Sequence, residues 1–133
     1  PAGYPADAFH HVLMSILVAA RAHGLQAIDG PFVAIRDVDG FRRSAELSAA
    51  LGYDGKWVLH PAQVDVGNEV FSPKAADFDR AQRIMAAYAH ATELAQGAVG
   101  AIVVDDEMVD EAGVKLAAAI LARGRAAGME ESQ

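Results

Sequence analysis

Apolar residues recur along the chain at two spacings, which predict helices that alternate with short strands. Three-and-four spacing, the pattern of one helix face, marks residues 8–23, 40–51, 62–71, 73–96 and 110–127. Short apolar runs predict strands at residues 25–28, 56–59 and 100–104. The predicted order is therefore helix, strand, helix, strand, helix, helix, strand, helix, after a loop over residues 1–6.

Polar residues at the segment ends predict where helices begin, since Asp and Ser side chains cap free backbone N–H groups. Proline after serine strengthens one of these starts, because proline suits the first helical position. The predicted N-caps are Asp7, Asp39, Ser72 and Asp110, and the predicted helix-ending glycines are Gly24, Gly52 and Gly97. The predicted inward faces are Phe41, Ala45, Ser48 and Leu51; Phe78, Ala81, Ile84, Met85, Tyr88 and Thr92; and Gly113, Leu116, Ala117, Ile120 and Leu121.

Strands that alternate with helices are typical of parallel α/β architecture. A closed barrel of eight parallel strands needs about 250 residues, and this chain has 133. The pattern therefore predicts either a small open parallel sheet or one part of a larger barrel.

The composition narrows the class of protein. With 53% hydrophobic residues the chain can form a core, which excludes a disordered protein. A net charge of −7 without a basic run argues against nucleic acid as a partner. No apolar run reaches the roughly 18 residues of a membrane span. The absence of cysteine excludes disulfides and thiol catalysis, and it is compatible with a cytoplasmic protein.

Candidate chemistry lies where strands are predicted to end, the usual position of ligand sites in parallel α/β folds. His60 follows one strand and precedes Pro61, which predicts extended backbone at His60. Asp29 follows another strand, beside Gly30 and Pro31. The alternative reading is structural: a solvated Lys56, a buried Trp57, a turn histidine and a turn aspartate.

A cluster of acids before the last helix is a second candidate: Asp105, Asp106, Glu107, Asp110 and Glu111. Such oxygen-rich groups can hold Mg²⁺ or Ca²⁺, although a solvated turn before a helix N-terminus is the commoner origin. Asp110 follows the apolar pair Met108-Val109, so partial desolvation could favour its protonated form and let it act as a proton donor. No phosphate-binding glycine loop, GxSxG or HExxH motif is present.

Six segments in the same order resemble the citrate lyase β-subunit-like family of HpcH/HpaI aldolases, which includes malyl-CoA and β-methylmalyl-CoA lyases. They are AIDGPF at 27–32, Arg36-Asp37, GYDGKWVLHPAQV at 52–64, NEVFSP at 68–73, RAQRIMAAY at 80–88, and a segment that ends in Met-Val-Asp at Asp110.

The resemblance implies the C-terminal half of a TIM (β/α)₈ barrel plus a helical C-terminal extension. Residues 1–72 would supply the last βα units of the barrel, and residues 73–133 a subunit-docking extension. The absent N-terminal half would then be a required partner. The chain begins at Pro1 without methionine, which also leads us to expect a fragment.

The resemblance further implies a Mg²⁺-dependent lyase that cleaves a malyl-CoA, citramalyl-CoA or citryl-type thioester to acyl-CoA and a keto acid. Asp110 would be the acid/base, acting on a neighbouring subunit of a homo-oligomer (trimer or hexamer). Asp29, Gly30 and Pro31 would line the pocket for the coenzyme A thioester, and His60 and Pro61 would shape it. The metal ligands would lie in the absent half, so this chain alone would be inactive.

Some points stay open at this stage. The family often carries an acidic-aromatic pair before Arg36-Asp37, where this chain has Ala34-Ile35, so its substrate preference is open. The acyl group, and thioester hydrolysis as a further step, are open too. The alternative function is a non-catalytic oligomerisation module, in which Asp110 is only a helix cap.

Overall fold

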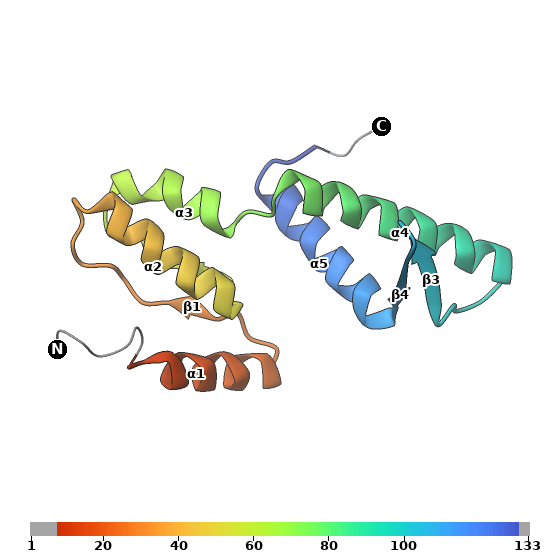
Figure 1. Cartoon of the computed structure of the whole chain (residues 1–133), viewed down its shortest axis with the longest axis horizontal. Coiled ribbons are helices and arrows are strands. Elements are labelled where there is room, and N and C mark those ends of the chain that lie inside the picture. Colours follow the sequence, from red (N-terminus) through yellow and green to blue (C-terminus); the bar gives the residue numbers. More distant parts are fainter. Residues whose placement is uncertain (1–7, 131–133) are drawn as a thin grey trace. The chain divides into compact units, whose positions relative to one another are not determined.

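The chain divides into two compact units in the computed structural model, which describes residues 8–130 (Figure 1). Unit 1 comprises Pro1–Phe71 and unit 2 comprises Ser72–Gln133. The predicted boundary lay between residues 72 and 73, but the roles predicted for its two sides stay predictions. The N-cap predicted at Asp7 lies outside the described residues.

Unit 1 is built around a parallel pair of very short strands. Its elements are α1 (His10–Ala22), β1 (Ile28–Asp29), α2 (Val38–Leu51), β2 (Gly55–Lys56), a 3-10 turn η1 (Pro61–Gln63) and α3 (Val64–Phe71). In β1 and β2, Ile28 lies opposite Gly55 and Asp29 opposite Lys56. Helix α2 connects the strands and packs on α3 (Figure 1). The unit is thus a β–α–β piece of α/β architecture.

The strands are shorter than predicted, because an apolar run forms a strand only where a second backbone pairs with it. Leu25 precedes β1, and Val58 and Leu59 follow β2; all three side chains are exposed. Burial is concentrated on the helix side, in the clusters Leu17, Ala27 and Tyr53, and Phe41, Ala45 and Val66.

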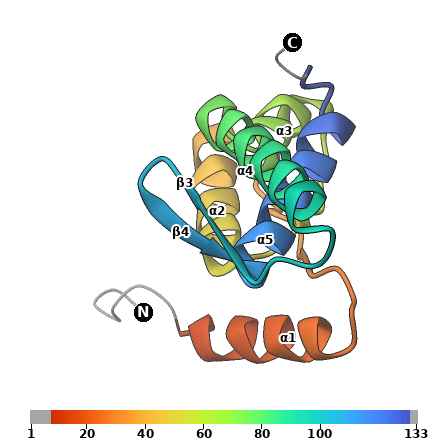
Figure 2. The same cartoon turned by 90° about the vertical axis from the view of Figure 1, so that its right-hand side faces the viewer.

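Unit 2 is a helical pair covered by a hairpin (Figure 2). Its elements are α4 (Ala75–Ala95), β3 (Ala101–Val104), β4 (Glu107–Asp110) and α5 (Glu111–Ala126). Strand β4, which the sequence did not predict, pairs antiparallel with β3. The turn between them is Asp105-Asp106, with φ of 53° and 62°. Two successive positive φ values are those of a type I′ turn, which matches the twist of a hairpin.

The core of unit 2 lies between α4, α5 and the hairpin. Its buried residues are Phe78, Ala81, Ile84, Ile102, Val104, Val109, Val114, Ala117 and Leu121. The inward face predicted for α4 is therefore confirmed at Phe78, Ala81 and Ile84. The prediction for Leu116 is wrong: it is 63% exposed, because residues 114, 117, 121 and 124 form the buried stripe of α5.

Three predicted helix boundaries are corrected by the caps. Asp37, not Asp39, caps α2: its Oδ1 accepts a hydrogen bond from the Gly40 N–H at 2.8 Å. Helix α4 begins after Lys74, whose backbone is extended (ψ 149°), so Ser72 and Pro73 precede it. Gln96, rather than Gly97, takes the left-handed position at the end of α4. Gly52 ends α2 as predicted, with φ of 105°.

None of the helices within residues 8–130 combines the length and the apolar character that a membrane crossing requires.

Candidate functional site

A buried ion pair lies at the carboxyl end of the parallel strands. Lys56 Nζ is 2.5 Å from Asp29 Oδ2, and the Ser48 hydroxyl of α2 donates to the same oxygen. The Gly30 N–H donates to Oδ1 at 2.8 Å. The side chains of Lys56 and Asp29 are 4% and 15% exposed. Because Ser48 belongs to α2, the pair points to the helix side of the sheet.

The surroundings of Asp29 favour its charged form. Burial alone would raise the pKa of this carboxyl, but the hydrogen bonds from Lys56, Ser48 and Gly30 and the charge of Lys56 together lower it. Burial and the charge of Asp29 both raise the pKa of Tyr53, whose hydroxyl donates to the Leu13 carbonyl at 2.8 Å. Asp29 thus holds β1, β2 and α2 together as a carboxylate, and its contact with a ligand stays a prediction.

The structural alternative for Lys56 and Trp57 is wrong. Lys56 is buried, because Asp29 lies opposite it and neutralises its charge. Trp57 is 62% exposed, because side chains alternate along extended backbone and it lies on the opposite face from Lys56.

The two predicted residues after β2 are exposed and lie in a tight turn. His60 is extended as predicted (φ −144°, ψ 142°), and Pro61 begins η1. The Nδ1 atom of His60 accepts a hydrogen bond from the Ala62 N–H at 3.1 Å. After β1, Gly30 and Pro31 are also exposed. A side chain at Gly30 would meet no atom within 4 Å. Open space therefore adjoins the end of β1.

Gln63, which the sequence analysis missed, connects the two loops. Its side chain is fully buried. Its Oε1 accepts from the Leu59 N–H at 3.0 Å, and its Nε2 donates to the Phe32 carbonyl at 3.2 Å. A single glutamine after a histidine-proline pair gives no periodic signal. Its role becomes visible only when the two segments are brought together.

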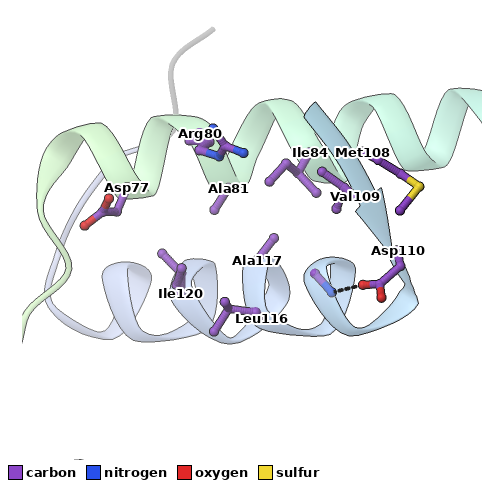
Figure 3. Close-up of a pocket in the computed structure, with 11 residues that line it drawn as sticks. Asp77, Arg80, Ala81, Ile84, Met108, Val109, Asp110, Leu116, Ala117 and Ile120 are labelled. Carbon is purple, nitrogen blue, oxygen red and sulfur yellow. Dashed lines mark hydrogen bonds between the residues drawn. The ribbon is translucent and has the colours of Figure 1, made fainter. Parts of the chain in front are cut away.

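Asp110 lies at one end of a pocket in unit 2 (Figure 3). The pocket has a volume of about 330 Å³ and is lined mainly by apolar side chains: Ala81, Ile84, Met108, Val109, Leu116, Ala117 and Ile120, with Asp77, Arg80 and Gly113. Asp110 caps α5, since its Oδ1 accepts from the Gly113 N–H at 2.9 Å. Within residues 8–130, its Oδ2 makes no hydrogen bond.

The partial desolvation expected around Asp110 is not observed. Asp110 is exposed, and Met108 is 76% exposed. Along β4 only Val109 turns inward, so the apolar pair before Asp110 does not enclose it. A dry environment for this carboxyl would need a surface that this unit does not supply.

Three of the other four acids of the cluster are paired with cations. Asp105 contacts Arg83 at 2.8 Å, Glu107 contacts Arg80 at 2.5 Å, and Glu111 contacts Lys115 at 2.8 Å. Hydrogen bonds from these partners lower the pKa of Asp105 and of Glu111. No group of three or more possible metal ligands occurs in the described part of the chain. The residues described here therefore do not fit a Mg²⁺ site.

Comparison with known proteins gives consistent matches. Residues 5–61 match the model of the HpcH/HpaI aldolase/citrate lyase family. A (3S)-malyl-CoA thioesterase of Cereibacter sphaeroides is 42% identical over 110 residues, 83% of this chain and 38% of the relative. An L-malyl-CoA/beta-methylmalyl-CoA lyase of Rhodobacter capsulatus is 43% identical over 115 residues, 86% of this chain and 35% of the relative.

Solved structures agree with these relatives. The protein CitE from Mycobacterium tuberculosis, in complex with magnesium, acetoacetate and coenzyme A, is 31% identical with a TM-score of 0.69. The match covers 92% of this chain and 43% of that one. A citrate lyase from Burkholderia xenovorans LB400, 24% identical with a TM-score of 0.69 over 94% and 39% of the two chains, supports the fold alone. The resemblance inferred from the sequence is thus confirmed, and the chain spans less than half of each relative.

Proposed function

Since residues 5–61 of this chain match the model of the HpcH/HpaI aldolase/citrate lyase family, we propose that the chain is the C-terminal part of a Mg²⁺-dependent acyl-CoA carbon–carbon lyase. The observation that carries the proposal is the similarity to malyl-CoA enzymes, 42% and 43% identical, over more than four fifths of the chain. The substrate class is a malyl-CoA or citramalyl-CoA type thioester.

Unit 1 would form the last strands of a larger (β/α)₈ barrel. The strand pair is parallel, as in a barrel, and one face of it is covered by α2. Ile28 in β1 and Trp57 just after β2 are exposed apolar side chains, which suits a sheet face that would be covered inside a barrel. Gly30, Pro31, His60 and Pro61 would then line the acyl-CoA pocket at the strand ends, while Asp29 keeps β1 and β2 in register.

Asp110 would supply the proton chemistry. In cleavage, the substrate hydroxyl gives its proton to a base of the complete enzyme and becomes the carbonyl of the keto acid. The adjoining carbon–carbon bond breaks, and its electron pair passes to the thioester as an enolate. The enolate carbon then takes a proton, and the Asp110 carboxyl is the proposed donor. The Gly113 N–H fixes Oδ1, so the carboxyl is held in one orientation with Oδ2 available to a substrate. An exposed Asp110 fits a role on a neighbouring subunit, whose surface would provide the dry environment.

Mg²⁺, when bound, would polarise the carbonyl of the keto acid. Because residues 8–130 do not fit a metal site, its ligands would come from outside this part of the chain.

The test is turnover of L-malyl-CoA by the complete enzyme that contains this chain, with Mg²⁺ and with a chelator. Glyoxylate and free coenzyme A are measured separately, because release of free coenzyme A distinguishes thioester hydrolysis from cleavage. The proposal expects Mg²⁺-dependent release of the keto acid. No turnover of malyl-CoA or citramalyl-CoA would overturn it.

The non-catalytic alternative has one observation in its favour: the hydrogen bond of Asp110 is that of an ordinary helix cap. Gel filtration combined with the same assay separates the two functions. A stable oligomer that stays inert with Mg²⁺ and acyl-CoA substrates would favour the interaction module.

A further inference from the structure

Gln63 connects two loops at a point that the strand ladder no longer reaches. The ladder between the segments ends where the Trp57 N–H donates to the Asp29 carbonyl at 3.0 Å. Beyond it, the Gln63 amide joins the Leu59 N–H to the Phe32 carbonyl. The first loop contains Gly30 and Pro31, and the second contains His60 and Pro61. One side chain thus bridges the two segments that carry the predicted pocket residues.

The amide suits this task because it both donates and accepts. Its two bonds satisfy one backbone N–H and one carbonyl in loops that have no strand partner at these positions. The side chain is fully buried, so water does not compete for either bond. Without the amide, the Leu59 N–H and the Phe32 carbonyl would each lose the hydrogen bond that holds its loop in place.

We propose that Gln63 is a positioning residue, which sets the distance between the loop after β1 and the loop after β2 and thereby the shape of the pocket for the acyl-CoA thioester. This inference rests on the proposed function, because only that function assigns the two loops to a ligand. Gln63 itself touches no reacting atom; it acts through Phe32 and Leu59.

Two substitutions separate positioning from packing. Gln63→Leu keeps an apolar filler and removes both hydrogen bonds. Gln63→Glu keeps the shape, and its protonated acid can still accept from Leu59 and donate to Phe32. The ionised form loses the donor. Burial should raise the pKa of the introduced carboxyl above its usual value of about 4.3. The loops should therefore be held at low pH and released at high pH in this variant alone.

The only tryptophan of the chain reports on the loop directly. Trp57 lies two residues before Leu59 and is 62% exposed. Acrylamide quenching of Trp57 is measured on the 133-residue chain from about pH 5 to about pH 9, with circular dichroism as the check on folding. Asp29, Asp37, Lys56, His60 and Asp65 are among the titratable groups on the adjoining elements. They are present in all three proteins, so a response confined to Gln63→Glu belongs to residue 63.

If Gln63 positions the loops, quenching of Trp57 should rise at least twofold with pH in Gln63→Glu. It should be high at every pH in Gln63→Leu and low at every pH in the wild type. If Gln63→Leu does not fold, the pH response of Gln63→Glu still decides. Equal quenching in Gln63→Glu and the wild type across the range would overturn the role.

The link to the ligand is tested separately in the complete enzyme. We expect the KM for malyl-CoA in Gln63→Glu to rise several-fold with pH relative to the wild type, with kcat little changed. A fluorescence response without a change in KM would overturn the assignment of the loops to the ligand, whereas turnover in the wild type tests the proposed function itself.

Discussion

Replacing Lys56 by methionine removes one partner of the buried pair and leaves its shape nearly unchanged. The ammonium is 4% exposed and the facing carboxylate 15% exposed, so solvent screens the pair very little. Breaking a buried ion pair on one side costs about 3 to 5 kcal/mol. Asp29 keeps its bonds from Ser48 and Gly30, so we expect the lower end, about 3 kcal/mol.

The assay is urea unfolding followed by Trp57 fluorescence, which reports on unit 1 because Trp57 is the only tryptophan. The double variant Asp29→Asn with Lys56→Met removes both charges and should recover about 1 kcal/mol or more of the loss. Arg42→Met, which breaks the exposed pair with Glu69, is the control and should change the free energy of unfolding little. If Lys56→Met lowers the free energy of unfolding by less than about 1 kcal/mol, the buried ion pair does not stabilise the fold as argued.

The same pair predicts an acid limb of stability. The pKa of Asp29 is lowered in the folded state, so its contribution is complete above the ordinary Asp pKa of about 3.9 and is lost as the pH falls through the folded value. In Lys56→Met this limb should shrink, because the main cation that stabilises the carboxylate is gone. An unchanged acid limb would contradict the cause given for the pKa shift.

The remaining predictions concern caps and packing. Asp37→Ala should destabilise the fold by about 1 kcal/mol because it removes the cap of α2, whereas Asp39→Ala should cost much less; urea unfolding that ranks them in the opposite order would contradict the observed cap. Gly124→Ala should cost about 1 to 3 kcal/mol, since its Cβ would overlap the Phe78 ring. Leu116→Gln, on the exposed face of α5, should change the free energy of unfolding by less than about 0.5 kcal/mol; thermal unfolding followed by circular dichroism measures both.

The buried faces of the helices could be predicted from the sequence, because each follows from the local spacing of apolar residues. Phe41, Ala45 and Phe78 were predicted inward and are buried. The end of β1 was also found from a local signal, since a glycine after Asp29 terminates the extended run. Strand β2 instead ends at Lys56, before the proline that was predicted to stop it. The phase of α5 was misjudged at Leu116, because alanines on both sides of the helix blur the apolar stripe.

The contacts that organise the candidate site could not be predicted in the same way. Lys56 meets Asp29 across 27 positions, and Gln63 meets Phe32 across 31. Such contacts depend on the strand register and on the course of the loops, which cannot be predicted from a single sequence. Strand β4 was missed because the apolar pair Met108-Val109 is too short to predict a strand by itself. The strand forms because it pairs with β3. Asp110 was singled out from its sequence neighbours, and the family resemblance added its acid/base role. Its capping bond explains its orientation rather than its chemistry.

The most direct test of the account is the rate of malyl-CoA cleavage by the complete enzyme carrying Asp110→Asn. Asparagine caps a helix as well as aspartate does, so α5 should remain folded while the proton donor is lost. Asp106→Asn is the matched control, since it makes the same change on an exposed turn residue that tolerates asparagine. The account predicts a fall in kcat of about 10²- to 10⁴-fold for Asp110→Asn and a near-normal rate for Asp106→Asn. Equal, near-normal rates in both variants would contradict the role of Asp110.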